Sequence, residues 1–141
     1  MEIPSKLQLQ IVSAERALVN EQVDEVEIPG SEGYFAVLPG HAPLLAALGA
    51  GELWYRVGKE KVYLAVGFGF AEVLPDRVTI LAQIAERAEE IDIARAEAAH
   101  KRALERLNAP AGVDFDFERA HIALMKALIR LQVASRARTR S

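Results

Sequence analysis

The pattern of the sequence changes once along the chain, near residue 85, and this change limits the fold more than any other feature. Eight of the nine glycines lie at or before Gly69, and the alanine-rich composition begins only after Ile84. The charge changes at the same place, because residues 1–85 carry a net charge of −5 and residues 86–141 carry +2, which together give −3. The sequence therefore predicts two parts, 1–85 and 86–141, with different secondary structure.

Apolar and polar residues alternate over short runs in the first part, which is the period of half-buried strands. Leu7, Leu9 and Ile11 face one way, and the glutamines between them face the other. Further segments repeat the pattern and are rich in β-branched and aromatic residues: 23–28, 34–38, 53–57, 62–66, 68–74 and 78–81. Because turn sequences and not helices separate these segments, we expect an antiparallel β-sandwich rather than a parallel sheet.

From Glu86 onward the apolar period is that of a helix. The stretch 91–107 is rich in Ala, Glu and Arg, which favour a first helix. The segment 108–112 ends it, and Asp114 or Asp116 is placed to cap a second helix that reaches about Ala134. The expected fold is α+β, with the sandwich followed by an antiparallel two-helix hairpin.

Alanines supply most of the seam that this hairpin would bury. An alanine methyl contributes on the order of 0.8 kcal/mol, while ordering a residue costs about 1–2 kcal/mol. We therefore expect the hairpin to lie near a balance between docked, extended and partner-bound states. The second helix also carries apolar residues on two sides, more than one alanine-rich helix can cover: Phe117, Ala120, Leu124, Ala127, Leu128 and Leu131 on one, and Ile122, Met125, Ile129 and Val133 on the other.

The residues offer little for catalysis or metal binding. The chain has no cysteine, which excludes disulfides and thiolate chemistry, and His41, His100 and His121 have no metal-ligand spacing. The glycines of 67–69 lead into a strand and not a helix, which does not fit a dinucleotide-binding turn. We expect no catalytic residue, no metal site and no required cofactor. Since no apolar run is long enough to span a bilayer and no signal peptide is evident, the chain is expected to be soluble, unexported and without direct membrane insertion.

Basic residues dominate the end of the chain. Six follow Glu118 with no acidic residue among them: Arg119, Lys126, Arg130, Arg136, Arg138 and Arg140. They form either a solvated face with a basic tail or a cationic arm for an acidic partner or a phosphate. If the hairpin folds back, Arg95 and Arg102 can converge with Lys126 and Arg130. The overall charge of −3 argues against nucleic acid as a partner.

Two segments resemble the ε subunits of bacterial and chloroplast F-type ATP synthases. One is Gly30-Ser31-Glu32-Gly33 followed by Leu38-Pro39-Gly40-His41-Ala42-Pro43, and the other is Ile91-Asp92-Ile93-Ala94-Arg95-Ala96. Residues 67–73 and 78–82 are similar to later segments of the same head. The resemblance covers nearly the whole chain in the right order.

This resemblance implies a non-catalytic rotor subunit, peripheral at the cytoplasmic face of the bacterial plasma membrane. The sandwich would pack on the γ subunit and on the ring of c subunits. The C-terminal helices would reach the α and β subunits and inhibit ATP hydrolysis. Carried over by position, Ser31, Glu32 and Tyr34 would contact the c ring and His41 would lie near γ. Tyr34 departs from the polar or acidic residue that is common at its position.

Some members of this family bind regulatory ATP, with or without Mg²⁺, on the folded hairpin. The matching positions here are Glu86, Ile91, Asp92, Arg95, Ala96, Arg102, Arg119, Lys126 and Arg130. Lys126 replaces an arginine of the ATP-binding relatives, so that a point charge replaces a bidentate contact. Two other functions remain open from the residues: a free-standing nucleotide-sensing protein, and a nucleic-acid-binding module, which the net charge and the lack of aromatic residues in the tail disfavour.

Overall fold

The computed structural model describes residues 3–108 and 116–139. Its backbone forms two compact units, Met1–Arg87 and Ala88–Ser141, and each is described by itself. The described strands lie in the first unit, here called the head, and the described helices lie in the second, called the hairpin. The division between them follows directly after the last strand.

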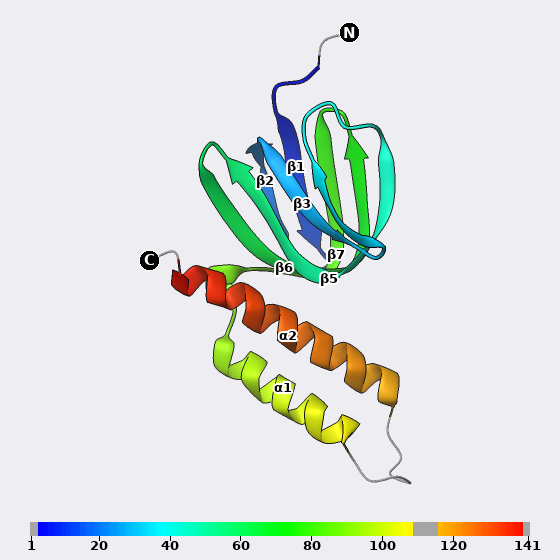
Figure 1. Ribbon diagram of the computed structural model, residues 1–141, viewed down its shortest axis with the longest axis vertical. Helices are drawn as coiled ribbons and strands as arrows, with labels where there is room; N and C mark the ends of the chain where they lie inside the picture. Colours follow the sequence, from blue (N-terminus) through cyan, green and yellow to red (C-terminus); the bar gives the residue numbers. More distant parts are fainter. Residues whose placement is uncertain (1–2, 109–115, 140–141) are drawn as a thin grey trace. The chain divides into compact units, whose positions relative to one another are not determined.

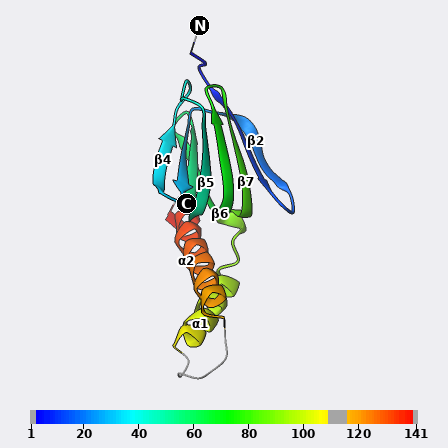
Figure 2. The same cartoon turned by 90° about the vertical axis from the view of Figure 1, so that its right-hand side faces the viewer.

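The strands of the head form one curled sheet (Figure 1). They are β1 (Leu7–Ser13), β2 (Ala17–Val23), β3 (Glu25–Gly30), β4 (Gly33–Val37), β5 (Leu44–Val57), β6 (Glu60–Leu74) and β7 (Arg77–Arg87). Their order is β2-β1-β7-β6-β5-β3-β4, and Figure 2 shows β2 and β4 at opposite edges. The sheet encloses its own core between two layers, so the β-sandwich predicted from the sequence is confirmed.

One pair of strands departs from the antiparallel arrangement that the sequence predicts. β1 and β7 are parallel, with Leu9 opposite Val78 and Ile11 opposite Ile80, whereas the other described pairs are antiparallel. A parallel pair needs a long connection between its strands. Here that connection is the rest of the sheet, β2 to β6, and therefore no crossover helix marks it in the sequence.

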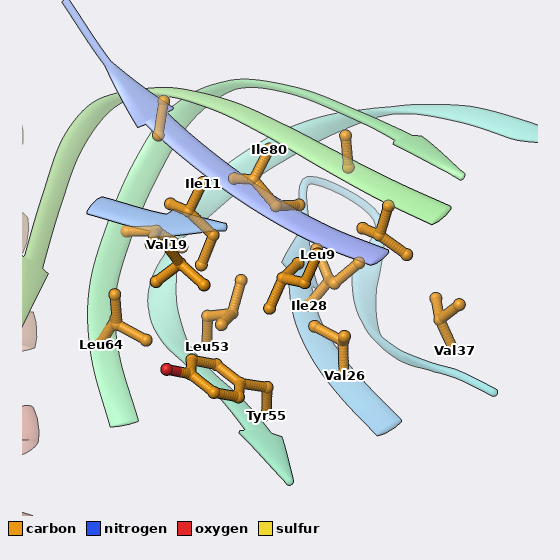
Figure 3. Packing of buried hydrophobic residues seen from close by; sticks show 14 of the residues in the cluster. Leu9, Ile11, Val19, Val26, Ile28, Val37, Leu53, Tyr55, Leu64 and Ile80 are labelled. Atoms are coloured by element: carbon orange, nitrogen blue, oxygen red, sulfur yellow. The ribbon is translucent and has the colours of Figure 1, made fainter. Parts of the chain in front are cut away.

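Alternating side chains build the core of the head. Leu7, Leu9 and Ile11 have no exposed surface, as the alternation in β1 predicts. Figure 3 shows side chains from β1, β3, β5 and β7 pointing toward one another, among them Ile28 and Tyr55. Each large aliphatic side chain buried in this way stabilises the fold by about 1.5–3 kcal/mol.

Two strands are longer than the sequence pattern indicates. The expected short strands 53–57, 62–66 and 68–74 belong to β5 and β6, which have 14 and 15 residues. Glycines inside these strands hide the alternation. At Gly69 the backbone φ is 145° and a Cβ atom would lie 1.9 Å from the carbonyl oxygen of Leu81. This glycine therefore marks a close approach of β6 to β7 within the sheet and not a turn.

The hairpin consists of α1 (Ile93–Leu107) and α2 (Phe117–Thr139), preceded by the short 3₁₀ turn η1 (Ala88–Glu90). Asp92 caps α1, where its Oδ1 accepts the Arg95 N–H at 3.0 Å. Asp116 does the same at the start of α2, where its Oδ1 accepts the Arg119 N–H at 3.1 Å. The alternative cap, Asp114, lies outside the described residues, and α2 ends five residues beyond the expected Ala134.

Alanines form the seam between the two helices, which lie side by side in Figures 1 and 2. Ala96 and Ala103 of α1 are buried, and so are Ala120 and Ala127 of α2, with a spacing of seven residues in each helix. Small side chains at this spacing let two helix backbones approach closely. Within the described ranges, neither helix is long and apolar enough to cross a membrane.

Candidate interaction surfaces

A groove opens at the tip of the head, where β3 turns into β4. Its volume is about 530 Å³, and it is lined by residues 30–35 of this hairpin turn and residues 44–47 at the start of β5. Ser31, Glu32 and Tyr34, the predicted c-ring residues, all lie on it. The structure therefore brings these three residues together around one concave surface.

Exposed apolar side chains surround this groove and continue across the sheet. Leu45 is 70% exposed, and Phe70 and Leu81 are more than half exposed. Phe70 lies opposite both Ala47 of β5 and Leu81 of β7, so these side chains follow one another across three strands. Sequence reasoning missed this surface. The available signal was that apolar residues occupy both faces of β6 and β7, which one core does not require.

His41 lies in the loop between β4 and β5 and is half-buried. Its Nδ1 donates to the carbonyl oxygen of Ala42 at 2.6 Å, and its backbone N–H donates to Leu38 O at 3.1 Å. Next to it, the Gly40 N–H donates to Pro75 O at 2.8 Å, which ties this loop to the turn between β6 and β7. His41 is therefore held in place by its own loop and does not line the groove at the tip.

Among the described residues of the head, Asp24 and Tyr55 have shifted pKa values, and both shifts have structural causes. Lys6, Gly58 and Arg56 surround the Asp24 carboxylate. The hydrogen bond from Lys6 and then that from the Gly58 N–H, at 2.7 Å, lower the pKa of Asp24 below its usual value. Burial raises the pKa of Tyr55, although the nearby Arg87 opposes this shift. Neither residue lies on the groove, so these shifts do not mark a reactive site.

The predicted ATP residues fall into two groups in the structure. Glu86 is the next-to-last residue of β7 in the head, whereas the other eight belong to the hairpin. Ile91 and Ala96 are buried, 7% and 3% exposed, and Asp92 is the helix cap of α1. These three therefore have packing and capping roles that account for their residue types without a ligand.

Cationic side chains of the hairpin line two pockets that share Arg119 and Ala123. One, of about 230 Å³ between α1 and α2, includes Arg102, Arg106 and Arg119. The other, of about 350 Å³ on α2, includes Arg119 and Lys126 together with the carboxylates of Asp116 and Glu118. Neither pocket includes Arg95 or Arg130. The structure thus brings together three of the predicted cations, Arg102, Arg119 and Lys126, around two adjoining pockets.

Glu86, Lys126 and Arg130 each interact with another group of the protein. A phosphate bound at these positions would have to replace such interactions. The smaller pocket is also below the roughly 300–1,000 Å³ of most small-molecule sites. Among the described residues, no three His, Cys, Asp or Glu side chains are grouped so that they could hold a metal ion.

Two family models match this chain in succession. The β-sandwich domain of the ATP synthase delta/epsilon chain matches residues 6–88, and the long alpha-helix domain of the same chain matches residues 89–135. An ATP synthase epsilon chain from Solibacter usitatus is 51% identical over 135 residues, covering 95% of this chain and 99% of that protein. One from Dehalococcoides mccartyi is 49% identical over 134 residues, covering 95% and 96%.

Solved structures agree with these matches. A chain in the mitochondrial ATP synthase of Euglena gracilis, determined with its OSCP, F1 and c-ring parts, has a TM-score of 0.81 and 27% identity, covering 95% of this chain and 84% of that one. A chain in the central stalk and c ring of the Tetrahymena thermophila enzyme shares the fold, with a TM-score of 0.58 at 13% identity. With both of its units matched, this chain belongs to the ATP synthase delta/epsilon chain family, as an epsilon-type subunit.

Proposed function

We propose that this ε subunit has no active site of its own and rotates with the central stalk of a bacterial ATP synthase, peripheral at the cytoplasmic face of the plasma membrane. The head would bind γ and the c ring, and the hairpin would reach α and β and inhibit ATP hydrolysis. The observation that most supports this role is the groove at the tip of the head with its apolar surroundings. A monomeric protein gains nothing from leaving Leu45 and Phe70 in water, whereas a partner would bury them.

The two parts of this surface suit different partners. At the groove, exposed Ser31 and Glu32 form a polar rim around apolar walls, as at many protein interfaces, and we assign this part to the c ring. Across β6 and β7, Phe70 and Leu81 offer a flatter apolar face, which suits packing on γ. His41 lies in a loop that follows β4, and we assign it to the γ contact as well.

Single charges placed on this surface test the assignment. Leu45→Glu is expected to lower ATP-driven proton pumping while ATP hydrolysis continues, because it weakens the c-ring contact. Phe70→Glu is expected to release ε from an αβγ complex during gel filtration. Val57→Glu, at the exposed apolar residue that ends β5, is the matched control and leaves both unchanged. Normal pumping and normal retention in all three variants would contradict the proposed surfaces.

The second helix of the hairpin supports the inhibitory role. Phe117 and Leu128 are exposed, and the sequence after Glu118 is basic. Attraction to an acidic surface of β would guide docking, and burial of the apolar side chains would slow release. In αβγ with added ε, Lys126→Glu with Arg130→Glu is expected to weaken inhibition of ATP hydrolysis, and salt to weaken it in the unmutated protein. Equal inhibition by a chain that ends at Arg87 would remove the hairpin from the mechanism.

Regulation by ATP would act through the cationic side chains of the two hairpin pockets, Arg102, Arg106, Arg119 and Lys126. ATP bound only to the folded hairpin stabilises that form by mass action and therefore opposes inhibition. Arg102→Ala and Arg119→Ala are expected to abolish the heat of ATP binding in calorimetry, and Lys126→Arg is expected to tighten binding. Arg95 lines neither pocket, but the resemblance places it among the ATP residues, and Arg95→Ala is therefore also expected to abolish binding. Arg16→Ala, in the head, serves as control. No heat of binding at millimolar ATP would contradict the regulatory site, and binding without co-purification of α, β and γ would favour a free-standing nucleotide sensor.

A further inference from the structure

The ladder between β3 and β5 is interrupted next to the groove. Glu27 pairs with Trp54, and the next pair is Gly30 with Leu48, so two residues of β3 lie opposite five residues of β5. One of the two β3 residues is Pro29, which has no N–H to donate to a ladder. Backbone groups of β5 in this stretch therefore need partners from elsewhere.

Tyr34 supplies one of these partners from β4, the strand beyond β3. Its hydroxyl accepts the backbone N–H of Glu52 at 3.0 Å. A Cβ atom on Gly51 would lie 2.3 Å from this hydroxyl oxygen and 2.6 Å from the Cβ of Pro29. The Tyr34 side chain thus crosses from β4 over β3 to β5, and it reaches β5 because residue 51 is a glycine.

The turn between β3 and β4 lies against the same stretch of β5. The Ser31 N–H donates to Ala47 O at 2.8 Å, and a Cβ atom on Gly49 would come within 3.3 Å of Gly30 O. The turn is therefore fastened to β5 at Ala47 on one side and, through Tyr34, at Glu52 on the other. Ser31 and Glu32 stand at the rim of the groove between these two attachments.

We infer that Tyr34 is a positioning residue for the rotor contact. Its hydrogen bond to the Glu52 N–H, together with the space at Gly51, holds the β3–β4 turn so that Ser31 and Glu32 face a c-subunit loop. The inference rests on the proposed c-ring contact. It accounts for a tyrosine at a position where the resemblance leads one to expect a polar or acidic side chain, because the hydroxyl acts on the backbone of β5 and not on the partner.

Two measurements on the full chain test this role. Tyr34→Phe keeps the ring and removes the acceptor, and Gly51→Ala keeps the hydroxyl and displaces it. In both variants the amide hydrogens of Glu52 and Ser31 are expected to exchange about three- to tenfold faster, the range that corresponds to one ordinary hydrogen bond, while β1 amides are unchanged. Tyr63→Phe removes the hydroxyl of a tyrosine on a different strand, β6. It is the matched control and is expected to leave exchange of the Ser31 amide unchanged.

The second measurement uses the assembled ATP synthase. Because the chain has no cysteine, Ser31→Cys introduces a unique thiol for cross-linking to c subunits that carry a loop cysteine. Adding Tyr34→Phe is expected to lower the yield severalfold at temperatures well below unfolding, where a purely stabilising residue would have no effect. An unchanged Ser31 amide, or an unchanged yield, overturns the positioning role. If Ser31→Cys alone gives no cross-link, the proposed c-ring contact is wrong, and so is the role of Tyr34 in that contact. Amide exchange would then still report separately whether Tyr34 holds the turn.

Discussion

Asp24 joins three segments of the head through one carboxylate: the chain before β1, its own junction between β2 and β3, and the β5–β6 turn. Since its pKa is lowered in the folded state, it stabilises the head at pH values above the unfolded pKa of about 3.9, and this contribution is lost as the pH falls through the folded pKa. Asp24→Asn is therefore expected to lower the free energy of unfolding at pH 7, and its difference from the unmutated protein is expected to shrink as the pH falls through the folded pKa of Asp24. Denaturant titrations from pH 7 into the acid range provide the measurement.

Lys6→Gln should reproduce part of this loss, because the lysine is the main cause of the lowered pKa of Asp24. Lys59→Gln is the control, because Lys59 lies in the β5–β6 turn beside Gly58 but the change leaves the contacts of Asp24 with Lys6, Arg56 and Gly58 in place. A pH dependence that survives in Asp24→Asn would assign the acid sensitivity of the head to other carboxylates.

Gly58 and Gly69 both have positive φ, and replacing each by alanine distinguishes the cost of backbone strain from the cost of a steric clash. A Cβ atom at Gly69 would meet the Leu81 carbonyl oxygen at 1.9 Å, whereas one at Gly58 would meet nothing within 4 Å. Gly69→Ala is expected to destabilise the head by about 3 kcal/mol or more, and Gly58→Ala by about 1 kcal/mol from strain alone. Thermal unfolding of the two variants measures the difference. If both variants lose the same free energy of unfolding, β6 and β7 can move apart at Gly69 without a further cost in stability.

At the scale of elements, the alanine seam limits how the hairpin can change. Ala127 is 1% exposed, and a leucine there would force α1 and α2 apart at a cost of about 1–3 kcal/mol. We expect Ala127→Leu to favour open forms of the hairpin, seen as faster proteolysis within it while the head stays intact. Ala94→Leu, at an exposed position of α1, is the control. Unchanged proteolysis in Ala127→Leu would show that the seam does not hold the helices together.

The same elements show how far sequence patterns carry. Strict alternation in β1 and alanine spacing in α1 predict both elements, because each buries one regular face. Of β2, only its last residue, Val23, falls in a predicted segment, since Asn20, Glu21 and Gln22 interrupt the alternation in an edge strand with one face toward solvent. The resemblance, and not the sequence pattern, predicts Ser31, Glu32 and Tyr34 as c-ring contacts, and in the structure all three line one groove. The role of Gly51 was not predictable, because it depends on a side chain that arrives from β4, 17 residues away in the sequence.

At the scale of the whole molecule, the division after Arg87 predicts that the head folds without the hairpin. Arg87 Nη2 donates to Leu18 O at 2.9 Å and so fastens the end of β7 to β2. A fragment of residues 1–87 is expected to unfold cooperatively and to bind γ. A fragment ending at Ala85 lacks this bond and also the pairing of Glu86 and Arg87 with β6, and it is expected to be less stable by at least about 1 kcal/mol. Denaturant unfolding and γ pull-down measure both. A 1–87 fragment that unfolds gradually or fails to bind γ would contradict an autonomous head.

The parallel pairing of β1 with β7 also bears on how the protein is made. During synthesis β1 leaves the ribosome first, but its neighbour β7 follows only after the five other strands. Until then β1 can pair with β2 alone, and the growing chain presents a strand edge to its surroundings. Because such non-local pairing closes slowly, the sheet is completed only as the hairpin begins to emerge. The nascent subunit is therefore most exposed to misassociation late in its translation, when nearly all of the head has been synthesised but β1 and β6 still lack their common neighbour β7.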